Sequence, residues 1–419
     1  MAELKKEITL LSGIGQLSTT LLGTGLFMVP AIAATIAGAL SLWSWVILLI
    51  AICPVALTFA MLGKRYPNAG GTAFFVRKAF NQRLEKSIAW LFLSVIPVGV
   101  PAAVALAAGF LQPLLPEWLD HPLIAQIITV ILLVVVNLSG AKASGRIQTL
   151  IALSILALVA AFWWYGDISP TQVTMPTIQT SDWLIIGSAL SVMFWCFVGI
   201  EAFAHMGEEF KSPERDFPIA IVIGCIIAGT VYWACSVVIV KFHAYGAPEF
   251  DAGSIPFLAD TLFGPQAKLI ISLLGFAACF ASINLYTQSL SRMLWAQARD
   301  YKPSSPIARL SSTGIPANAT FAVGGVLLIS CFIGEWSQLD LEFFVKLANG
   351  VFILVYFMAM LAACRLLTGL ARSLAFVALF TCVMMMFFVG WSMIYALVLF
   401  SFLLCKIKPE QPADHARTI

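Results

Sequence analysis

Long stretches of apolar residues recur along the whole chain, separated by short segments that hold most of the charged residues. A transmembrane helix needs about 20 consecutive apolar residues, whereas the strands of a membrane barrel would show a short alternating pattern. The pattern therefore predicts an all-α integral membrane protein with about twelve transmembrane helices. The predicted ranges are 8–36, 39–62, 87–115, 123–138, 147–165, 183–205, 218–240, 267–295, 317–333, 341–363, 373–389 and 391–404.

Composition and charge agree with this prediction. Of the 419 residues, 60% are hydrophobic and 11% are charged, and the mean hydropathy is +0.94, whereas soluble domains carry about 25% charged residues. With the N-terminus in the cytoplasm, only Lys241, Lys268 and Lys346 of the 24 Lys and Arg residues fall on the outer side. Because cytoplasmic loops are enriched in Lys and Arg, we expect both termini in the cytoplasm.

The connections between the predicted spans are short, so the chain is expected to form one membrane domain without a soluble catalytic module. The largest inner connection, 63–86, is basic and is expected to hold a short surface helix. The cysteines and histidines are scattered singly, and no nucleophile–base pair or phosphate-binding loop is present. We therefore predict no enzymatic activity, no metal or other cofactor, and no nucleic-acid partner.

The first and sixth predicted spans are interrupted by glycine near the expected centre of the bilayer. The first reads Leu22-Gly23-Thr24-Gly25-Leu26-Phe27 and the second reads Phe197-Val198-Gly199-Ile200-Glu201. Irregular backbone is tolerated at that depth only where it lines a cavity or packs in protein, and paired interruptions point to the substrate site of a transporter. We expect inverted repeats over about 8–165 and 183–364, followed by two additional helices over 372–405.

The interrupted segments offer groups that suit a small zwitterion. Backbone N–H groups at the start of a half-helix attract a carboxylate, and Gly23, Gly25 and Gly199 would let that carboxylate approach closely. The hydroxyl of Thr24 adds a polar contact. The alternative is that the glycines only allow neighbouring helices to pack closely.

One acidic and several aromatic residues accompany the second interruption. Glu201 could receive an ammonium group, carry a proton, or hydrogen-bond to the interrupted backbone. Trp195 and Phe197 could close over a small substrate, or they could pack between helices. Ser282, Tyr286 and Tyr356 on later spans are further polar groups, which we interpret individually as structural.

Several motifs resemble those of the amino acid–polyamine–organocation transporters. The resemblance covers Gly13 to Gly15 with Leu22 to Pro30, Arg65 to Gly71, Trp195 to Glu201 with Glu209 to Pro218, and Ser291 to Asp300. The segments 91–103, 191–205 and 278–289 further resemble family members that export L-methionine and branched-chain amino acids from bacteria.

This resemblance implies the five-plus-five inverted-repeat fold of the leucine transporter, with discontinuous first and sixth helices. It implies that the substrate meets the backbone of these helices, that Trp195 is the gating aromatic, and that Glu201 is the proton-coupling candidate. The implied substrate-binding residues are Leu22, Gly23, Thr24, Gly25, Trp195, Phe197, Val198 and Gly199. One feature departs from some proton-coupled relatives, because 147–165 contains no lysine.

The sequence and the resemblance together predict a secondary transporter in the inner membrane of a bacterium. We expect it to export small neutral amino acids (Met, Leu, Ile and Val) by alternating access, with protons as the coupling ion. An importer or exchanger of the same fold is the first alternative. A channel is less compatible, because a channel needs a continuous polar pore.

Overall fold

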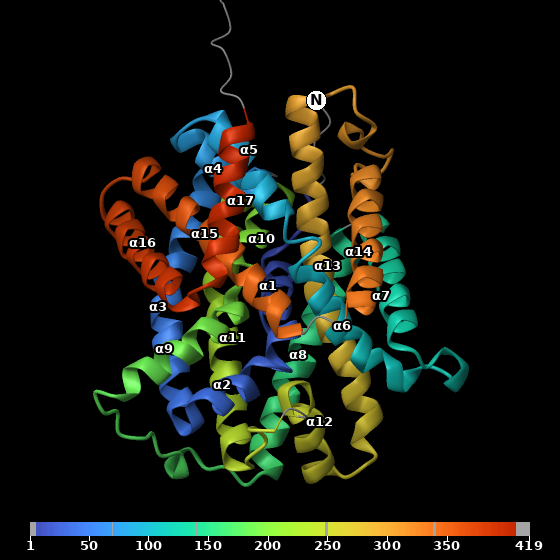
Figure 1. Cartoon of the computed structure of the whole chain (residues 1–419), viewed down its shortest axis with the longest axis vertical. Coiled ribbons are helices and arrows are strands. Elements are labelled where there is room, and N and C mark those ends of the chain that lie inside the picture. The colour runs from blue at the N-terminus through green and yellow to red at the C-terminus, as the bar shows by residue number, and fades with distance from the viewer. Residues whose placement is uncertain (1–5, 69, 140, 248–249, 338–340, 408–419) are drawn as a thin grey trace, which may run out of the picture.

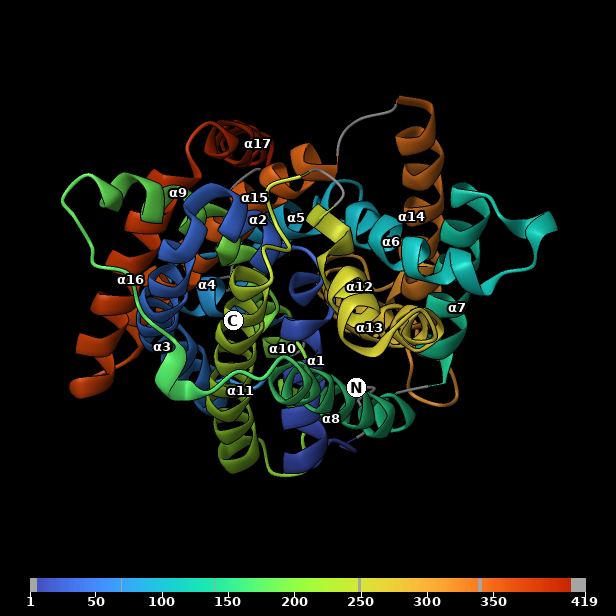
Figure 2. The ribbon, with the colours of Figure 1, turned by 90° about the horizontal axis from the view of Figure 1, so that it is seen from below.

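A computed structural model describes residues 6–68, 70–139, 141–247, 250–337 and 341–407 (Figure 1). Over these residues the chain is helical, with one isolated parallel bridge between Ile8 and Phe210. In two perpendicular views α1 and α11 lie in the middle of the bundle, while α16 and the pair α7 and α14 lie at opposite edges (Figures 1 and 2).

Each predicted span contains a helix or a pair of helices. These are α1 (Leu10–Leu26) with α2 (Val29–Ala37), α3 (Ser41–Arg65), α5 (Gln82–Leu93) with α6 (Gly99–Leu111), α7 (Pro122–Leu138), α8 (Ala141–Tyr165), α9 (Asp182–Met193) with α10 (Ile200–Ala204), α11 (Pro213–Lys241), α13 (Ala267–Tyr301), α14 (Ala317–Ser337), α15 (Leu341–Leu366), α16 (Leu370–Val389) and α17 (Ser392–Lys406). The expected all-α fold is confirmed.

Shorter elements fill the connections. The helix expected between 63 and 86 is present as α4 (Gly71–Ala79), and its apolar face is buried rather than lying free on the surface. A further helix, α12 (Phe250–Phe263), precedes α13. The 3-10 turns are η1 (Gly38–Leu40), η2 (Gln112–Leu114), η3 (Glu117–Leu119), η4 (Pro170–Gln172), η5 (Phe194–Phe197), η6 (Gly207–Glu209) and η7 (Pro306–Ala308).

The outer surface of the bundle suits lipid. Among the described residues, eight helical stretches are long and apolar enough to cross a membrane, and three shorter apolar helices accompany them. Large apolar side chains project outward from them, including Trp164 at 83% exposed and Phe387 at 81% exposed. In water such a surface would be costly, because contiguous exposed apolar surface is rare on soluble monomers.

The first span is discontinuous, but its break does not lie at the glycine pair. The α1 helix continues through Gly23 and Gly25 to Leu26, and the break falls at Phe27 and Met28. The next residues explain this position. Pro30 has no N–H to donate to the Leu26 carbonyl, and proline fits the first turn of a new helix. The expected discontinuity is confirmed, and its expected position is corrected.

The sixth span breaks where the sequence predicts. After α9 the chain tightens into η5, Val198 is extended, and Gly199 adopts a φ of +136° before α10 begins. Side chains rarely tolerate this φ, so glycine is the residue that permits the break.

The third span, predicted as one continuous span over 87–115, also breaks. Residues 94–98 form turns between α5 and α6, and the Val95 carbonyl accepts N–H groups from Val98, Gly99 and Val100 at 2.8 to 3.2 Å. Pro97 and Pro101 have no N–H to continue the regular ladder of helical hydrogen bonds. Among the described residues, three spans are therefore irregular within the apolar part of the bundle.

Candidate substrate-binding site

A cavity lies where the three irregular spans meet the eighth and tenth spans. The empty space within it is about 410 Å³, which includes the open solvent at its mouth. It is lined by Thr20, Leu21, Thr24, Val95, Gly99, Val100, Ala103, Trp195, Val198, Ser282, Ile283, Tyr286 and Phe352. The lining is mostly apolar, its polar groups are hydroxyls and an indole N–H, and it includes no charged side chain.

The structure brings some of the predicted site residues together at this cavity. Thr24, Trp195 and Val198 line it, and the indole Nε1 of Trp195 lies 3.4 Å from the Thr24 hydroxyl, across the first and sixth spans. The other predicted contacts do not line the cavity and are buried behind it. These are Leu22, Gly23, Gly25, Phe197 and Gly199.

The glycine pair of α1 has a packing role in this structure. A Cβ on Gly23 would lie 2.5 Å from both the Ala278 carbonyl oxygen and the Ser282 Cβ of α13. A Cβ on Gly25 would lie 2.1 Å from the Tyr232 hydroxyl of α11. Both distances are shorter than real contacts, so α1 can approach α13 and α11 only because these residues are glycine.

Side chains from two neighbouring helices hold the last turns of α1. Ser282 donates its hydroxyl to the Thr20 carbonyl at 2.7 Å, and Tyr232 donates its hydroxyl to the Leu21 carbonyl at 2.5 Å. Both Thr20 and Leu21 also line the cavity. The wall that α1 contributes is thus positioned by α13 from one side and by α11 from the other.

Glu201 does not line the cavity, but it contacts Tyr286, which does. Its side chain is fully buried, and its Oε2 accepts the N–H of Gly199 at 2.9 Å. Tyr286 donates its hydroxyl to Oε1 at 2.8 Å, and the Tyr356 hydroxyl lies 2.5 Å from Oε2. Because Tyr286 itself lines the cavity, the carboxyl group is connected to the cavity through that hydroxyl.

The loop after α10 is joined to α13 by a buried ion pair. Arg292 Nη2 lies 2.9 Å from Glu209 Oε2, and the Nε of the same guanidinium contacts Oε1. The Glu209 carbonyl also accepts the N–H groups of Glu7 and Ile8, both at 2.9 Å, which fixes the start of α1. The sixth span, the eighth span and the start of the first are therefore held together at one end of the bundle.

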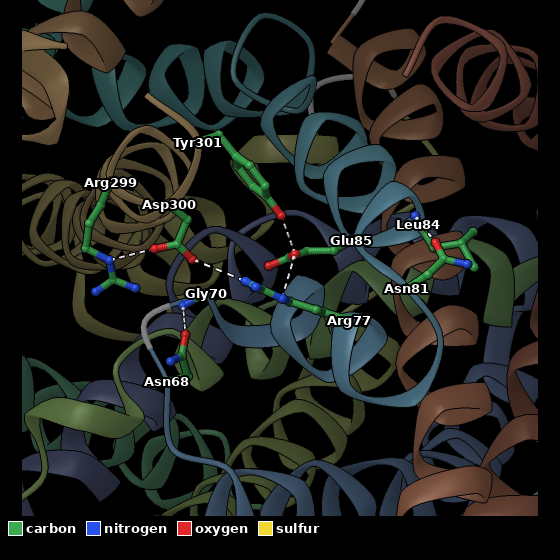
Figure 3. Close-up of polar contacts among 9 residues, drawn as sticks. All are labelled: Asn68, Gly70, Arg77, Asn81, Leu84, Glu85, Arg299, Asp300 and Tyr301. Atoms are coloured by element: carbon green, nitrogen blue, oxygen red, sulfur yellow. Dashed lines mark hydrogen bonds and ion pairs between the residues drawn. The ribbon is translucent and has the colours of Figure 1, made fainter. Parts of the chain in front are cut away.

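A second polar cluster lies at that same end, which is drawn at the top of Figure 1. We call this end of the bundle the basic end, because Arg77 and Lys78 of α4, Arg299 of α13 and Lys406 of α17 lie there. Figure 3 shows the cluster, in which Glu85 of α5 faces Arg77 and the C-terminal residues of α13.

The contacts of the cluster join three helices. The Tyr301 hydroxyl donates to Glu85 Oε2 at 2.5 Å, and Arg77 lies 3.6 Å from Glu85 and 3.5 Å from Asp300 (Figure 3). Arg299 pairs with Asp300 at 2.8 Å. Nearby, Asn81 begins α5 by accepting the Leu84 N–H at 2.9 Å, and Asn68 accepts the Gly70 N–H at 2.8 Å. The loop helix α4 is thereby fixed to α5 and α13.

The Glu85 carboxyl gives this cluster a pH dependence. Burial raises its pKa above the ordinary value of 4.5, outweighing the Tyr301 hydroxyl and Arg77, which lower the pKa. The folded state then holds this proton more tightly than the unfolded state, so stability is lost as the pH rises through the raised pKa. We expect the Tm of Glu85→Gln minus that of the wild type to increase as the pH rises from 4.5 towards neutrality.

Thermal unfolding in detergent over that pH range checks this expectation. Glu214→Gln is the control, because Glu214 is exposed, and its Tm difference from the wild type should stay nearly constant. A Tm difference for Glu85→Gln that is equally independent of pH would contradict the assigned effect of burial.

Several groups in the site were not identified from the sequence. Phe352, Val95 and Gly99 line the cavity, and Tyr232 holds α1, yet none of them was singled out as functional. Pro97 was the available signal for the third span, because a proline inside an apolar run marks an irregular helix. Within the described part of the chain, no group of three or more His, Cys, Asp or Glu side chains is arranged to hold a metal ion.

The fold is of the leucine-transporter type, as the resemblance implied. A solved structure of a Na⁺-coupled sialic acid symporter, in a substrate-bound outward-open state, matches with a TM-score of 0.58. The match covers 94% of this chain and 90% of that one at 14% sequence identity, so it shows the fold alone.

The family follows from the sequence comparisons. The family model for amino acid permeases matches residues 8–411, and the chain belongs to this family. It is 48% identical to the L-methionine/branched-chain amino acid exporter YjeH of Escherichia coli (strain K12), over 95% of both proteins. It is 27% identical to the uncharacterized amino acid permease YecA of Bacillus subtilis (strain 168), over 95% of both.

A third relative is more distant. The chain is 25% identical to the cadaverine/lysine antiporter of Escherichia coli (strain K12), over 74% of this chain and 71% of that protein. The family resemblance predicted from the motifs is confirmed by these comparisons.

Proposed function

We propose that this protein is a secondary transporter that exports L-methionine and the branched-chain amino acids across the inner membrane of a bacterium. The observation that carries this proposal is the cavity at the three irregular spans, which offers hydroxyl groups and apolar walls without a charged side chain. The similarity to a relative described as an exporter of these amino acids supports the same substrates.

The lining residues suit a zwitterion with an apolar side chain. Val95, Val100 and Phe352 offer apolar surface to the substrate side chain, and a thioether packs favourably against aromatic rings. Thr24 and Trp195 offer polar contacts to the charged end. Because no Lys or Arg lines the cavity to receive a second carboxylate, we propose that Asp and Glu are excluded.

Of the predicted binding residues, we propose direct substrate contact for Thr24, Trp195 and Val198 in the state described here. Contacts from the backbone of Phe197 and Gly199 require a rearrangement of the sixth-span break. Backbone contacts from Leu22, Gly23 and Gly25 likewise require a rearrangement of α1, because these residues lie in continuous helix.

We propose that the basic end faces the cytoplasm, with both chain termini on that side, since Lys and Arg are enriched there. The Arg292–Glu209 pair and the contacts of Glu201 then close the cytoplasmic side. Alternating access would open it by moving the first and sixth spans relative to α13. We further propose that residues 8–165 and 183–364 form the inverted repeats, and that protons drive export.

Methionine tolerance in cells tests the proposed direction. Cells that lack the gene are expected to be inhibited by methionine-containing peptides at concentrations at least about tenfold lower than cells in which the gene is restored. The reason is that peptide hydrolysis loads the cytoplasm with methionine. A tenfold change in tolerance requires a maintained methionine gradient of only about 1.4 kcal/mol. Growth inhibition and intracellular methionine are measured together, with a glutamate-containing peptide as the control. Equal tolerance in both strains, with expression confirmed, would count against export.

Counterflow in proteoliposomes separates the alternative functions. A carrier loaded with unlabelled methionine takes up labelled methionine transiently and saturably, whereas a channel shows linear conductive flux. Exchange without net efflux would favour an obligatory exchanger over an exporter.

A further inference from the structure

The hydroxyl group of Tyr356 faces two acceptors at once. It lies 2.8 Å from the backbone carbonyl oxygen of Phe197 and 2.5 Å from Oε2 of Glu201. Tyr356 and Glu201 are both fully buried. A tyrosine hydroxyl carries one proton, and a carbonyl oxygen carries none, so the two contacts cannot both be supplied by Tyr356.

Two hydrogen-bonded arrangements of Tyr356 are therefore possible, and they differ in whether Glu201 carries a proton. With a proton on Glu201, its Oε2–H donates to the Tyr356 oxygen, and Tyr356 donates to the Phe197 carbonyl. Without that proton, Tyr356 donates to the Glu201 carboxylate, and the Phe197 carbonyl loses this donor. The Gly199 N–H and the Tyr286 hydroxyl face the carboxyl group in both states.

The surroundings of Glu201 make this exchange local. Tyr286 on α13 and Tyr356 on α15 are the titratable side chains that contact it in the described structure. No hydrogen bond or ion pair from α1, α3 or α4, which also pack on α10, reaches its carboxyl group. Arg292 on α13 is engaged by Glu209, and His205, one turn further along, is stacked on Phe92.

The Phe197 carbonyl is a suitable place for the proton to affect substrate binding. Phe197 is the last residue of η5 and directly precedes Val198, which lines the cavity. A buried carbonyl without a donor is unfavourable, and a substrate ammonium group that reaches it when the sixth-span break rearranges is a donor that would satisfy it.

The geometry points to Tyr356 as the positioning residue through which protonation of Glu201 determines whether the Phe197 carbonyl already accepts a hydrogen bond or is free to accept one from the substrate. A proton on Glu201 and an ammonium group at Phe197 then exclude each other. On substrate binding the proton leaves Glu201 Oε2 for the aqueous side to which the site is open, and the Tyr356 hydroxyl turns from Phe197 to Glu201. This inference rests on the proposed function and supplies its coupling: one proton enters for each amino acid that leaves.

The test is the pH dependence of methionine affinity in Tyr356→Phe. In the wild type, protons compete with substrate, so the apparent KM for methionine in proteoliposome counterflow is expected to rise as the pH falls, at most about tenfold per pH unit for one proton. In Tyr356→Phe the Phe197 carbonyl never receives the hydroxyl, so the KM should become nearly independent of pH while exchange continues.

Tyr232→Phe is the matched control. Tyr232 is equally buried and donates to a backbone carbonyl of the first span, that of Leu21, but it contacts no carboxyl group. Its KM should keep the pH dependence of the wild type even if its maximal rate falls. Tyr356→Phe with the same pH dependence as the wild type would overturn the inference.

A second measurement covers the case in which Tyr356→Phe does not fold. Purified wild type in weakly buffered detergent, with a pH indicator, is expected to release protons when methionine is added, and glutamate should release none. Methionine binding without proton release would overturn the inference and leave the proposed substrate intact. Absence of methionine binding and counterflow in folded wild type would instead refute the proposed function.

Discussion

Gly25→Ala is expected to reduce methionine counterflow at least about tenfold, and adding Tyr232→Phe is expected to restore part of the loss. The new Cβ would lie 2.1 Å from the Tyr232 hydroxyl. That hydroxyl cannot move freely, because it is held by the Leu21 carbonyl and its ring stacks on Trp45 at 4.7 Å. Overpacking a filled interior costs about 1–3 kcal/mol or more, and about 1.4 kcal/mol is a factor of ten.

Removing the hydroxyl relieves the closest contact. The remaining neighbours of the new Cβ, the Cys196 sulfur and the Tyr232 Cζ, lie at 3.1 Å and require only a small shift. The restored activity therefore separates a packing role for Gly25 from direct contact with substrate. If the double variant is as inactive as Gly25→Ala while Tyr232→Phe is active by itself, Gly25 contacts the substrate directly.

The measurement is initial counterflow rate per folded protein in proteoliposomes, with Gly325→Ala as control. Gly325 is also a helical glycine, on α14, and a Cβ built on it meets no atom within 4 Å. Its variant should transport at close to the wild-type rate. A comparable loss in both variants would show that the assay reports the general cost of changing a helical glycine.

The helices and the sixth-span break could be predicted because their causes are local. An apolar run of bilayer length can satisfy its backbone in lipid only as a helix. The sixth-span break needs a residue at positive φ, and Gly199 marks that position in the sequence. The predicted spans 373–389 and 391–404 correspond to α16 and α17 in the structure.

The first break lies beside a proline rather than at the predicted glycine pair, because the two residue types cost a helix different free energies. A glycine inside a helix costs about 1 kcal/mol relative to alanine, whereas a proline costs about 3 kcal/mol because it removes a hydrogen bond and clashes with the preceding turn. Pro30 and, in the third span, Pro97 and Pro101 therefore decide where the helices end, while Gly23 and Gly25 remain helical.

The partners of the site residues could not be predicted from local patterns. Tyr232 and Leu21 are 211 positions apart, and Tyr356 and Glu201 are 155 positions apart. A tyrosine in an apolar span has the same local pattern whether its hydroxyl meets a carbonyl, a carboxyl group or lipid headgroups. Only the packing of α11 and α15 against the broken spans distinguishes these cases.

Glu201→Gln is expected to lose accumulation driven by a pH gradient while retaining methionine binding and counterflow. Glutamine has the size of glutamate and can still face the Gly199 N–H and the two tyrosine hydroxyls, so the sixth-span break should keep its geometry. It cannot gain or lose a proton between the two states of the cycle. The link between proton and substrate is then removed, although the cavity, which Glu201 does not line, is preserved.

The magnitude follows from the coupling. An exchange of one proton for one zwitterion can support about tenfold accumulation per unit of pH difference, and without coupling the accumulation ratio falls to about one. Labelled methionine is measured in proteoliposomes with an imposed pH gradient, beside counterflow at equal pH. Glu201→Asp, which can still titrate, is the comparison and should keep part of the accumulation. If Glu201→Gln accumulates methionine as the wild type does while Glu201→Ala misfolds, Glu201 serves only to hold α10, α13 and α15 together at the break.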